Sequence, residues 1–166
     1  MKAGILSDTH DYRPAAEGAL ALFRAEGIGI LLHLGDVCSP ELLDGYPDLG
    51  IPLVCVFGNN DTDRDGLQAA TRGAFRQGPH IEEVAGRRIL MAHSYRDLEA
   101  ELGERGRFDL VLFGHTHRPL TMRVGRALVL NPGEGCGFMR GKPTCAVVEL
   151  DTMEPRIVPI PLPEPR

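Results

Sequence analysis

Four short, almost continuous apolar runs constrain the fold of this chain more than any other feature of its sequence. They are KAGILS (2–7), IGILLHLG (28–35), IPLVCVFG (51–58) and DLVLFG (109–114). Unbroken hydrophobicity over a short run is typical of a strand that is buried on both faces. Each run ends abruptly at a polar or Gly-rich cluster, which predicts buried strands followed by polar loops.

The segment between the first two runs, PAAEGALALFRAEG (14–27), predicts a helix. Pro14 is favoured in a first helical turn, where its missing N–H costs no hydrogen bond. Leu20, Phe23 and the neighbouring alanines give the helix an apolar face, and Gly27 is typical of a residue that ends a helix. The order strand, helix, strand indicates a helix that covers a sheet.

A second amphipathic segment, YRDLEAELGERG (95–106), predicts a helix between the strand-like run RRILMAH (87–93) and the run at 109–114. The first two thirds of the chain therefore has the order β-α-β-α-β. In the last third we expect antiparallel strands that complete a second sheet, because strand-like runs alternate with Gly or Pro turns. These runs are PLTMRVG (119–125), RALVLNPG (126–133), KPTCAVVEL (142–150) and PRIVPIPL (155–162). The proline-rich end (159–166) predicts a surface strand followed by a loose tail.

The length of 166 residues predicts one domain over 1–166. The net charge of -5 argues against a nucleic-acid-binding or membrane-binding surface, because both need a concentrated excess of Lys and Arg. No stretch reaches the roughly 20 apolar residues of a membrane helix, so we expect a cytoplasmic protein without a membrane partner. The four cysteines form no C-x-x-C pair, and we expect them to be small buried residues. They are Cys38, Cys55, Cys136 and Cys145.

Five of the predicted strands end in side chains that can bind a metal ion. In an open α/β sheet, ligands gather beyond the carboxyl ends of the strands, where loops converge over a rigid frame. Mixed oxygen and imidazole ligands suit Mn, Fe, Zn or Co, and seven ligands exceed what one tetrahedral ion takes. Two ions about 3.5–4 Å apart would use all of them if one carboxylate is shared. The seven residues are Asp8, His10, Asp36, Asn59, His93, His115 and His117.

Each of these residues also has an ordinary structural role. Asp8 and Asp36 are typical of helix N-caps or turns, Asn59 is typical of an Asx turn, and a single His is more often a hydrogen-bonded structural residue than a ligand. These separate roles do not explain why five strands end in the same way. The joint pattern therefore favours a metal centre.

Six short motifs, taken in order, resemble those of the calcineurin-like metallophosphoesterases, and most of all their small single-domain bacterial and archaeal phosphodiesterases. The motifs are DTH (8–10), GDVCSP (35–40), GNND (58–61), AHS (92–94), GHTHRP (114–119) and NPG (131–133). The resemblance runs from residue 3 to about residue 150. It implies an α/β fold of four layers, an α/β/β/α sandwich in which two mixed β-sheets are flanked by helices.

The resemblance also implies a division of the ligands between two divalent ions. The first ion would be held by Asp8, His10, Asp36 and His117, and the second by Asp36, Asn59, His93 and His115. Asp36 would bridge the ions, and we expect Asp36, Asn59 and His93 to serve catalysis as well. The implied ion is Mn²⁺ first, with Ni²⁺, Fe²⁺, Co²⁺, Zn²⁺ or Mg²⁺ as alternatives. The implied reaction is hydrolysis of a small phosphodiester by in-line attack of a hydroxide that bridges the ions.

The chain departs from the family pattern next to Asn59. Larger relatives have a His in the following position, which is thought to protonate the leaving group, whereas this chain has Asn60, which cannot donate a proton at pH 7. We therefore expect activated leaving groups to react best. We also expect Asn60 and Arg118 to contact the substrate. Asp61 could supply a proton instead, although turn formation is its commoner role.

Two further departures add negative charge, because Asp11 replaces the Gly of the family's SDTHG and Glu134 replaces the Ser of NPGS. If both carboxylates face the site, they disfavour a dianionic monoester and favour a diester; otherwise they support the ligands or lie in solvent. Arg13, like Arg118, could contact a phosphate or be a surface charge. We expect a structural role for His33, which lies inside a predicted strand, and an exposed position for His80.

Two alternative functions stay open at this point. A phosphomonoesterase or nucleotidase would use the same metal ligands. A non-catalytic scaffold would use the fold alone, as the scaffold subunit of the eukaryotic retromer complex does after losing metal-site histidines. This chain keeps His10, His115 and His117, which favours catalysis. The implied partner is a small phosphoester, and the resemblance also allows a homo-oligomer.

Overall fold

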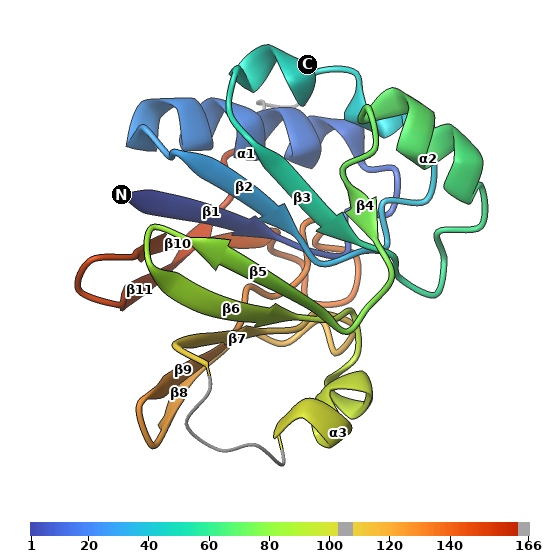
Figure 1. Cartoon of the computed structure of the whole chain (residues 1–166). Helices are drawn as coiled ribbons and strands as arrows, with labels where there is room; N and C mark the ends of the chain where they lie inside the picture. The colour runs from blue at the N-terminus through green and yellow to red at the C-terminus, as the bar shows by residue number, and fades with distance from the viewer. Residues whose placement is uncertain (103–107, 163–166) are drawn as a thin grey trace.

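The computed structural model describes residues 1–102 and 108–162, which form four layers (Figure 1). The strands are β1 (Lys2–Leu6), β2 (Ile30–His33), β3 (Leu53–Val56), β4 (Phe75–Arg76), β5 (His80–Val84), β6 (Arg87–Met91), β7 (Leu110–Leu112), β8 (Leu120–Val124), β9 (Ala127–Asn131), β10 (Thr144–Glu149) and β11 (Glu154–Pro159). The helices are α1 (Arg13–Glu26), α2 (Arg64–Ala70) and α3 (Glu99–Leu102), and 3-10 turns lie at Pro40–Leu43, Pro47–Leu49 and Tyr95–Leu98.

Two mixed sheets lie face to face in the middle of the molecule (Figure 1). The first has six strands in the order β11-β10-β1-β2-β3-β4, and the second has five in the order β5-β6-β7-β9-β8. Helices α1 and α2 lie on the outer side of the first sheet, and α3 lies on the outer side of the second. The predicted α/β/β/α sandwich is confirmed.

Three apolar clusters join these layers. One fills the space between the sheets, with Ile5 and Leu32 from the first sheet and Met91 and Leu112 from the second. Another joins the first sheet to α1, and the third lies on the outer face of the second sheet and includes Leu98 from the turn before α3. Within the described part of the chain, no helix is both long enough and apolar enough to cross a membrane.

Helix α1 confirms the helix predicted over 14–27. Pro14 lies in its first turn, and Gly27 ends it in the left-handed conformation, with its N–H bonded to the carbonyl of Arg24. The buried side is made of three alanines together with Leu20 and Phe23, so the helix packs closely on the sheet. The chain returns from α1 directly into β2, which pairs parallel with β1.

Two expectations from the sequence need correction, and the structure adds three short elements. The strand-like runs of the last third do not all build the second sheet, because β10 pairs with β1 and carries β11 with it into the first sheet. The short elements α2, β4 and β5 were not predicted. The segment 95–106 forms a 3-10 turn followed by α3, which ends at Leu102, and the rest of that segment lies outside the described residues, as does the end of the expected loose tail (163–166).

The strand directions explain where the polar loops meet. Strands β1, β2 and β3 run parallel in the first sheet, and β6, β7 and β9 run parallel in the second. The loops beyond their carboxyl ends meet at one edge of the sandwich, where Asp36 after β2 contacts His93 after β6. All seven predicted ligands follow strands that end at this edge.

Candidate metal centre

Asp8, His10 and His117, which we call the Asp8 group, bring three ligand atoms together. His117 Nε2 lies 3.3 Å from Asp8 Oδ1, and His10 Nε2 lies 3.9 Å from the same oxygen. The two imidazole rings stack with their centres 5.3 Å apart. Ligand atoms bound about 2.0–2.3 Å from one ion lie about 3–4 Å from each other, so this spacing fits a shared metal ion.

Asn59, His93 and His115, which we call the Asn59 group, lie on the other side of Asp36. His93 Nε2 lies 3.0 Å from Asn59 Oδ1 and 3.2 Å from His115 Nδ1. The other ring nitrogen of His93 lies 2.8 Å from the backbone carbonyl of Leu34, to which it donates. That bond leaves Nε2 to face Asn59 and Asp36. Asn59 and His115 are exposed, whereas His93 is buried.

Asp36 lies between the two groups, as expected of a bridging carboxylate. Its Oδ2 atom is 3.7 Å from His10 Nε2 and 3.4 Å from His93 Nε2. Asp8 also faces both sides, since ligand atoms of Asp8, Asp36 and His93 all lie within 4.8 Å of one another. The structure therefore brings all seven predicted ligands to one place.

Two buried polar atoms test whether these residues fit a metal ion. Asp8 Oδ1 and His10 Nε2 are both buried and have no hydrogen-bond partner among the described residues. Burying such atoms without a partner is costly, and buried charges are usually paired or bound to a metal. Both atoms point to the position that His117 Nε2 also faces, so a divalent cation there would satisfy them together.

Most of the predicted ligands share an unusual backbone conformation. Five of the seven ligands have a positive φ, which is uncommon for residues other than Gly although Asp and His tolerate it better than most. Strained conformations of this kind cluster at functional sites. The values are 54° at Asp8, 43° at His10, 56° at Asp36, 63° at His115 and 57° at His117.

Asp61 ties the loop after β3 to the loop after β2. Its buried carboxylate accepts hydrogen bonds from the backbone N–H groups of Gly58, Asp36, Val37 and Cys38, over 2.7–3.0 Å. The sequence suggested a turn residue or a proton donor here. Because both oxygens of the buried carboxylate accept backbone N–H groups, Asp61 is better suited to hold the backbone of Asp36 in position than to donate a proton.

Close backbone packing fixes the two loops nearest the carboxylates. A Cβ atom at Gly58 would overlap the Asp36 carboxylate, and one at Gly114 would overlap the hydroxyl of Ser7. Asn131 then holds the loop that carries the two C-terminal histidines, because its amide donates to the carbonyl of Gly114 at 2.8 Å. Gly58, Gly114 and Asn131 all lie in the sequence motifs, but the sequence did not predict these contacts.

Glu134 is buried and faces His117. Its buried Oε2 atom lies 2.7 Å from His117 Nδ1. Burial acts to raise the pKa of Glu134, but hydrogen bonds from His117 and from the N–H groups of Arg140 and Met139 outweigh burial and lower this pKa. Of the positions that the sequence left open for Glu134, the structure has the one beside a predicted ligand, because its carboxylate is buried against His117.

The two buried carboxylates of the centre have opposite pKa shifts. Burial acts to raise the pKa of Asp36, but hydrogen bonds from His93 and Asn60 outweigh burial and hold this pKa well below its usual range. At Asp8 burial prevails and the pKa is raised. Burial acts to lower the pKa of His93, yet the bond and charge of Asp36 raise it. The ionised carboxylate of Asp36 thus attracts positive charge to this place.

The other two histidines are not members of the ligand cluster. His33 is buried, and its Nδ1 accepts the N–H of Gly35 at 3.2 Å, which agrees with its expected structural role. Burial lowers the pKa of His33 to about 4. His80 is not exposed as expected, since its side chain is only 21% accessible and its Nε2 lies 2.8 Å from Glu82 Oε2.

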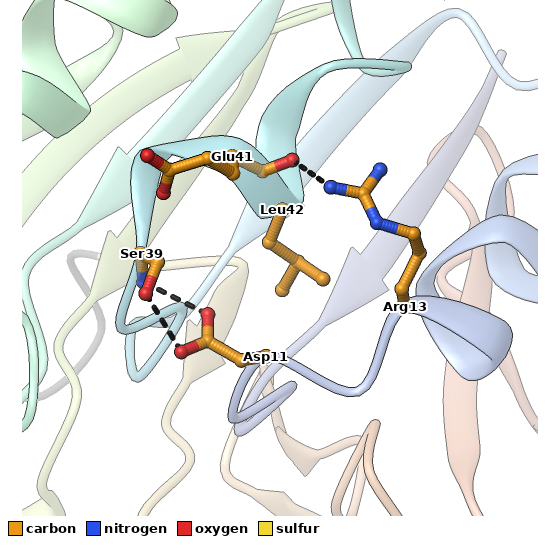
Figure 2. A pocket seen from close by; sticks show the side chains of 5 residues that line it. All are labelled: Asp11, Arg13, Ser39, Glu41 and Leu42. Atoms are coloured by element: carbon orange, nitrogen blue, oxygen red, sulfur yellow. Dashed lines mark hydrogen bonds between the residues drawn. The ribbon is translucent and has the colours of Figure 1, made fainter.

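The proposed substrate contacts have mixed positions. Asn60 donates from both its backbone and its side chain to the carboxylate of Asp36, at 2.8 and 2.7 Å, and so uses one of the two N–H groups of its amide. Arg118 is exposed beside the ligands. Arg13 donates instead to the carbonyl of Glu41 at 2.5 Å, so it is held by a neighbouring loop (Figure 2).

A pocket of about 270 Å³ lies between the segment after β1 and the 3-10 turn at Pro40–Leu43. Figure 2 shows the side chains that line it. Its walls contain none of the seven ligands; the lining residues are Asp11, Arg13, Ser39, Glu41 and Leu42. The carboxylate of Asp11 accepts hydrogen bonds from the backbone and hydroxyl of Ser39, at 2.9 and 2.7 Å. Asp11 therefore fixes the loop that leads away from Asp36.

Known proteins resemble this chain in sequence and in structure. The family model for the calcineurin-like phosphoesterase superfamily domain matches residues 1–153. Phosphodiesterase MJ0936 from Methanocaldococcus jannaschii is 30% identical over 161 residues, which cover 94% of this chain and 97% of that protein. The solved structure of an archaeal phosphodiesterase has a TM-score of 0.88 at 29% identity, over 96% of this chain and 99% of the other. Vacuolar Protein Sorting 29 from Cryptosporidium parvum shares the fold alone, with a TM-score of 0.68 at 17% identity over 95% of each chain.

Proposed function

Because this chain belongs to the calcineurin-like phosphoesterase superfamily, we propose that it is a metal-dependent phosphodiesterase whose reaction takes place at the centre around Asp36. One observation carries the proposal. Asp8 Oδ1 and His10 Nε2 are buried, lack partners among the described residues, and face the position that His117 Nε2 also faces. A scaffold would gain nothing from holding these atoms in this way.

We further propose that two ions bind, one in each group, with Asp36 shared. The position of Asp36 Oδ2 between His10 and His93 supports a bridge. Mn²⁺ is the proposed ion, and Ni²⁺, Fe²⁺, Co²⁺, Zn²⁺ and Mg²⁺ are alternatives that the same oxygen and nitrogen ligands accept. Bound divalent ions would supply an activated water and would stabilise negative charge on the phosphoryl oxygens.

The residues around the ions would orient the substrate but would not protonate its leaving group. The second amide N–H of Asn60 and the guanidinium of Arg118 are the proposed contacts with phosphoryl oxygens. With Asp61 buried against backbone donors, neither residue after Asn59 can protonate a leaving group. Aryl esters, whose leaving groups need no proton, should therefore react faster than alkyl esters.

The preference for diesters now has a different basis. The acidic side chains do not support it, because Glu134 is buried against His117 and the Asp11 carboxylate is bonded to Ser39. The proposal relies on the archaeal relative that is named a phosphodiesterase. A phosphomonoesterase with the same centre is the alternative. One domain over 1–166, a cytoplasmic location and a homo-oligomeric state stay predictions of the sequence.

The test is hydrolysis of bis-p-nitrophenyl phosphate by metal-free protein reconstituted with each divalent ion, compared with p-nitrophenyl phosphate as the matched monoester. We expect Mn²⁺ to restore activity, EDTA to abolish it, and the diester to give the higher kcat/KM. A higher kcat/KM on the monoester would select the alternative enzyme. Protein that binds no ion at saturating Mn²⁺ and hydrolyses neither ester would instead fit a non-catalytic scaffold.

A further inference from the structure

Glu134 is buried among hydrogen-bond donors. The side chain is 1% exposed, and its Oε1 atom accepts the backbone N–H groups of Met139 and Arg140 at 3.0 and 2.5 Å. Its Oε2 atom lies 2.7 Å from His117 Nδ1, 3.1 Å from the N–H of Met139 and 3.9 Å from the thiol of Cys136. An ionised carboxylate suits this environment because it only accepts hydrogen bonds.

The contact with His117 decides which ring nitrogen of the histidine carries the proton. Facing an ionised carboxylate, Nδ1 must donate, so a neutral His117 ring keeps its lone pair on Nε2. Nε2 is the atom that lies 3.3 Å from Asp8 Oδ1 in the Asp8 group. Metal-bound histidines usually donate their other N–H to a carboxylate or carbonyl, which fixes the ring and raises its basicity.

The same three side chains could be taken for a separate metal site. Ligand atoms of His117, Glu134 and Cys136 lie within 4.8 Å of one another. Both oxygens of Glu134 already accept backbone N–H groups, and Oε2 also lies 2.7 Å from His117 Nδ1, so the carboxylate has little capacity left to bind an ion. The contacts therefore favour support of His117 over a separate ion.

We propose that Glu134 is a positioning residue for the metal centre: it holds His117 with the proton on Nδ1 and the Nε2 lone pair aimed at the ion. This inference deepens the proposed function and rests on it. The family pattern NPGS has Ser in this position, so the carboxylate is a feature of this chain. The same carboxylate accepts the backbone N–H groups of Met139 and Arg140, and thus connects the loop after β9 to His117.

The variant that tests this role is Glu134→Gln. An amide presents an NH₂ group at one end, and both ends of Glu134 face donors. If the NH₂ group faces His117, Nδ1 must become the acceptor and the proton moves to Nε2, where it blocks the metal. We expect Mn²⁺ binding at the Asp8 group, measured by isothermal titration calorimetry, to weaken about 10- to 100-fold.

The matched control is Asp109→Asn, at the amino end of β7, away from the ligands. Asp109 is also a mostly buried carboxylate, and it accepts the N–H of Arg88 at 3.0 Å and a bond from Arg126 at 2.5 Å. This variant should lose stability without a change in metal affinity. Equal metal affinity in the wild type and in Glu134→Gln would overturn the positioning role.

A measurement on the metal-free wild type keeps the test independent of variants and of catalysis. Two-bond ¹H–¹⁵N correlation spectra distinguish the two neutral tautomers of a histidine, and we expect the Nδ1–H form for His117. An Nε2–H form would overturn the inference even if the protein binds Mn²⁺ and hydrolyses diesters. If the wild type shows the Nδ1–H form but binds no metal, the proposed function fails and the Glu134 contact survives.

Discussion

The Asp8 group and the Asn59 group use similar side chains but hold them differently. In the Asp8 group, two ligand atoms have no partner among the described residues. Two of its three ligands are also supported on the side away from the site: Ser7 donates to Asp8 Oδ2, and Glu134 holds His117. In the Asn59 group the ligand atoms contact each other, since His93 Nε2 lies 3.0 Å from Asn59 and 3.2 Å from His115.

The two groups differ in how far hydrogen bonds hold the ligand side chains in place before an ion binds. A buried ligand whose other polar atoms are bonded elsewhere can only point into the site, so little order is lost when an ion binds. The exposed Asn59 and His115 have to exchange contacts with each other for contacts with the ion. We therefore expect two binding steps, with the tighter one at the Asp8 group.

The largest effect should come from Asp36, which lies between the two groups. Asp36→Asn removes the negative charge that lies between His10 and His93, so both binding steps should weaken together. By the scale of a lost electrostatic contact in an active site, kcat should fall by roughly 10³-fold. Metal titration followed by diester hydrolysis measures both effects. If the variant still bound two ions and kept its kcat, Asp36 would not be the bridging ligand.

A matched pair of histidine variants should separate the two groups. His10→Ala removes a ligand from the Asp8 group, and His115→Ala removes one from the Asn59 group. We expect the first to abolish the tighter step, with at least about a 100-fold loss of affinity, and the second to weaken only the looser step, by about tenfold. Calorimetric titration of both variants with Mn²⁺ measures this. The reverse assignment would show that supporting bonds do not rank the two groups.

Much of the centre could be predicted because each ligand follows a strand that the sequence marks clearly. The apolar runs before Asp8, Asp36 and His115 are short and almost continuous, and parallel strands bring their ends to one edge. The supporting residues could not be predicted in the same way. Asp61 bonds to N–H groups 23 to 25 positions earlier in the chain, a contact that depends on how two loops meet.

The division of strands between the sheets was also beyond the sequence. Strand β10 reads as the next member of an antiparallel series, yet it pairs with β1 at the other end of the chain. Successive residues of β10 are buried on opposite faces of the sheet: Cys145 faces α1, and Ala146 faces the second sheet. Local periodicity reports that a strand is buried on both sides, but not which sheet supplies its neighbour.

The smallest effect should come from His33, which supports the Asp8 group from inside the first sheet. Its Nε2 lies 3.4 Å from the hydroxyl of Thr9, the residue between Asp8 and His10 in the chain. Burial lowers the pKa of His33 from 6.5 to about 4, so the folded protein keeps the ring neutral where the unfolded chain takes up a proton. Stability is therefore full above pH 6.5 and is lost as the pH falls towards 4.

Between pH 7 and pH 5 this difference should cost the metal-free wild type about 2 kcal/mol of unfolding free energy. His33→Gln keeps an acceptor and a donor but does not titrate, so its stability should fall less over the same range. Urea unfolding in EDTA at the two pH values measures the difference, and subtracting the two proteins removes the groups that titrate in both. If both proteins lost the same unfolding free energy between pH 7 and pH 5, a neutral His33 would not contribute to the stability of the fold around the Asp8 group. The contrast between the groups would then rest on Glu134 and Ser7.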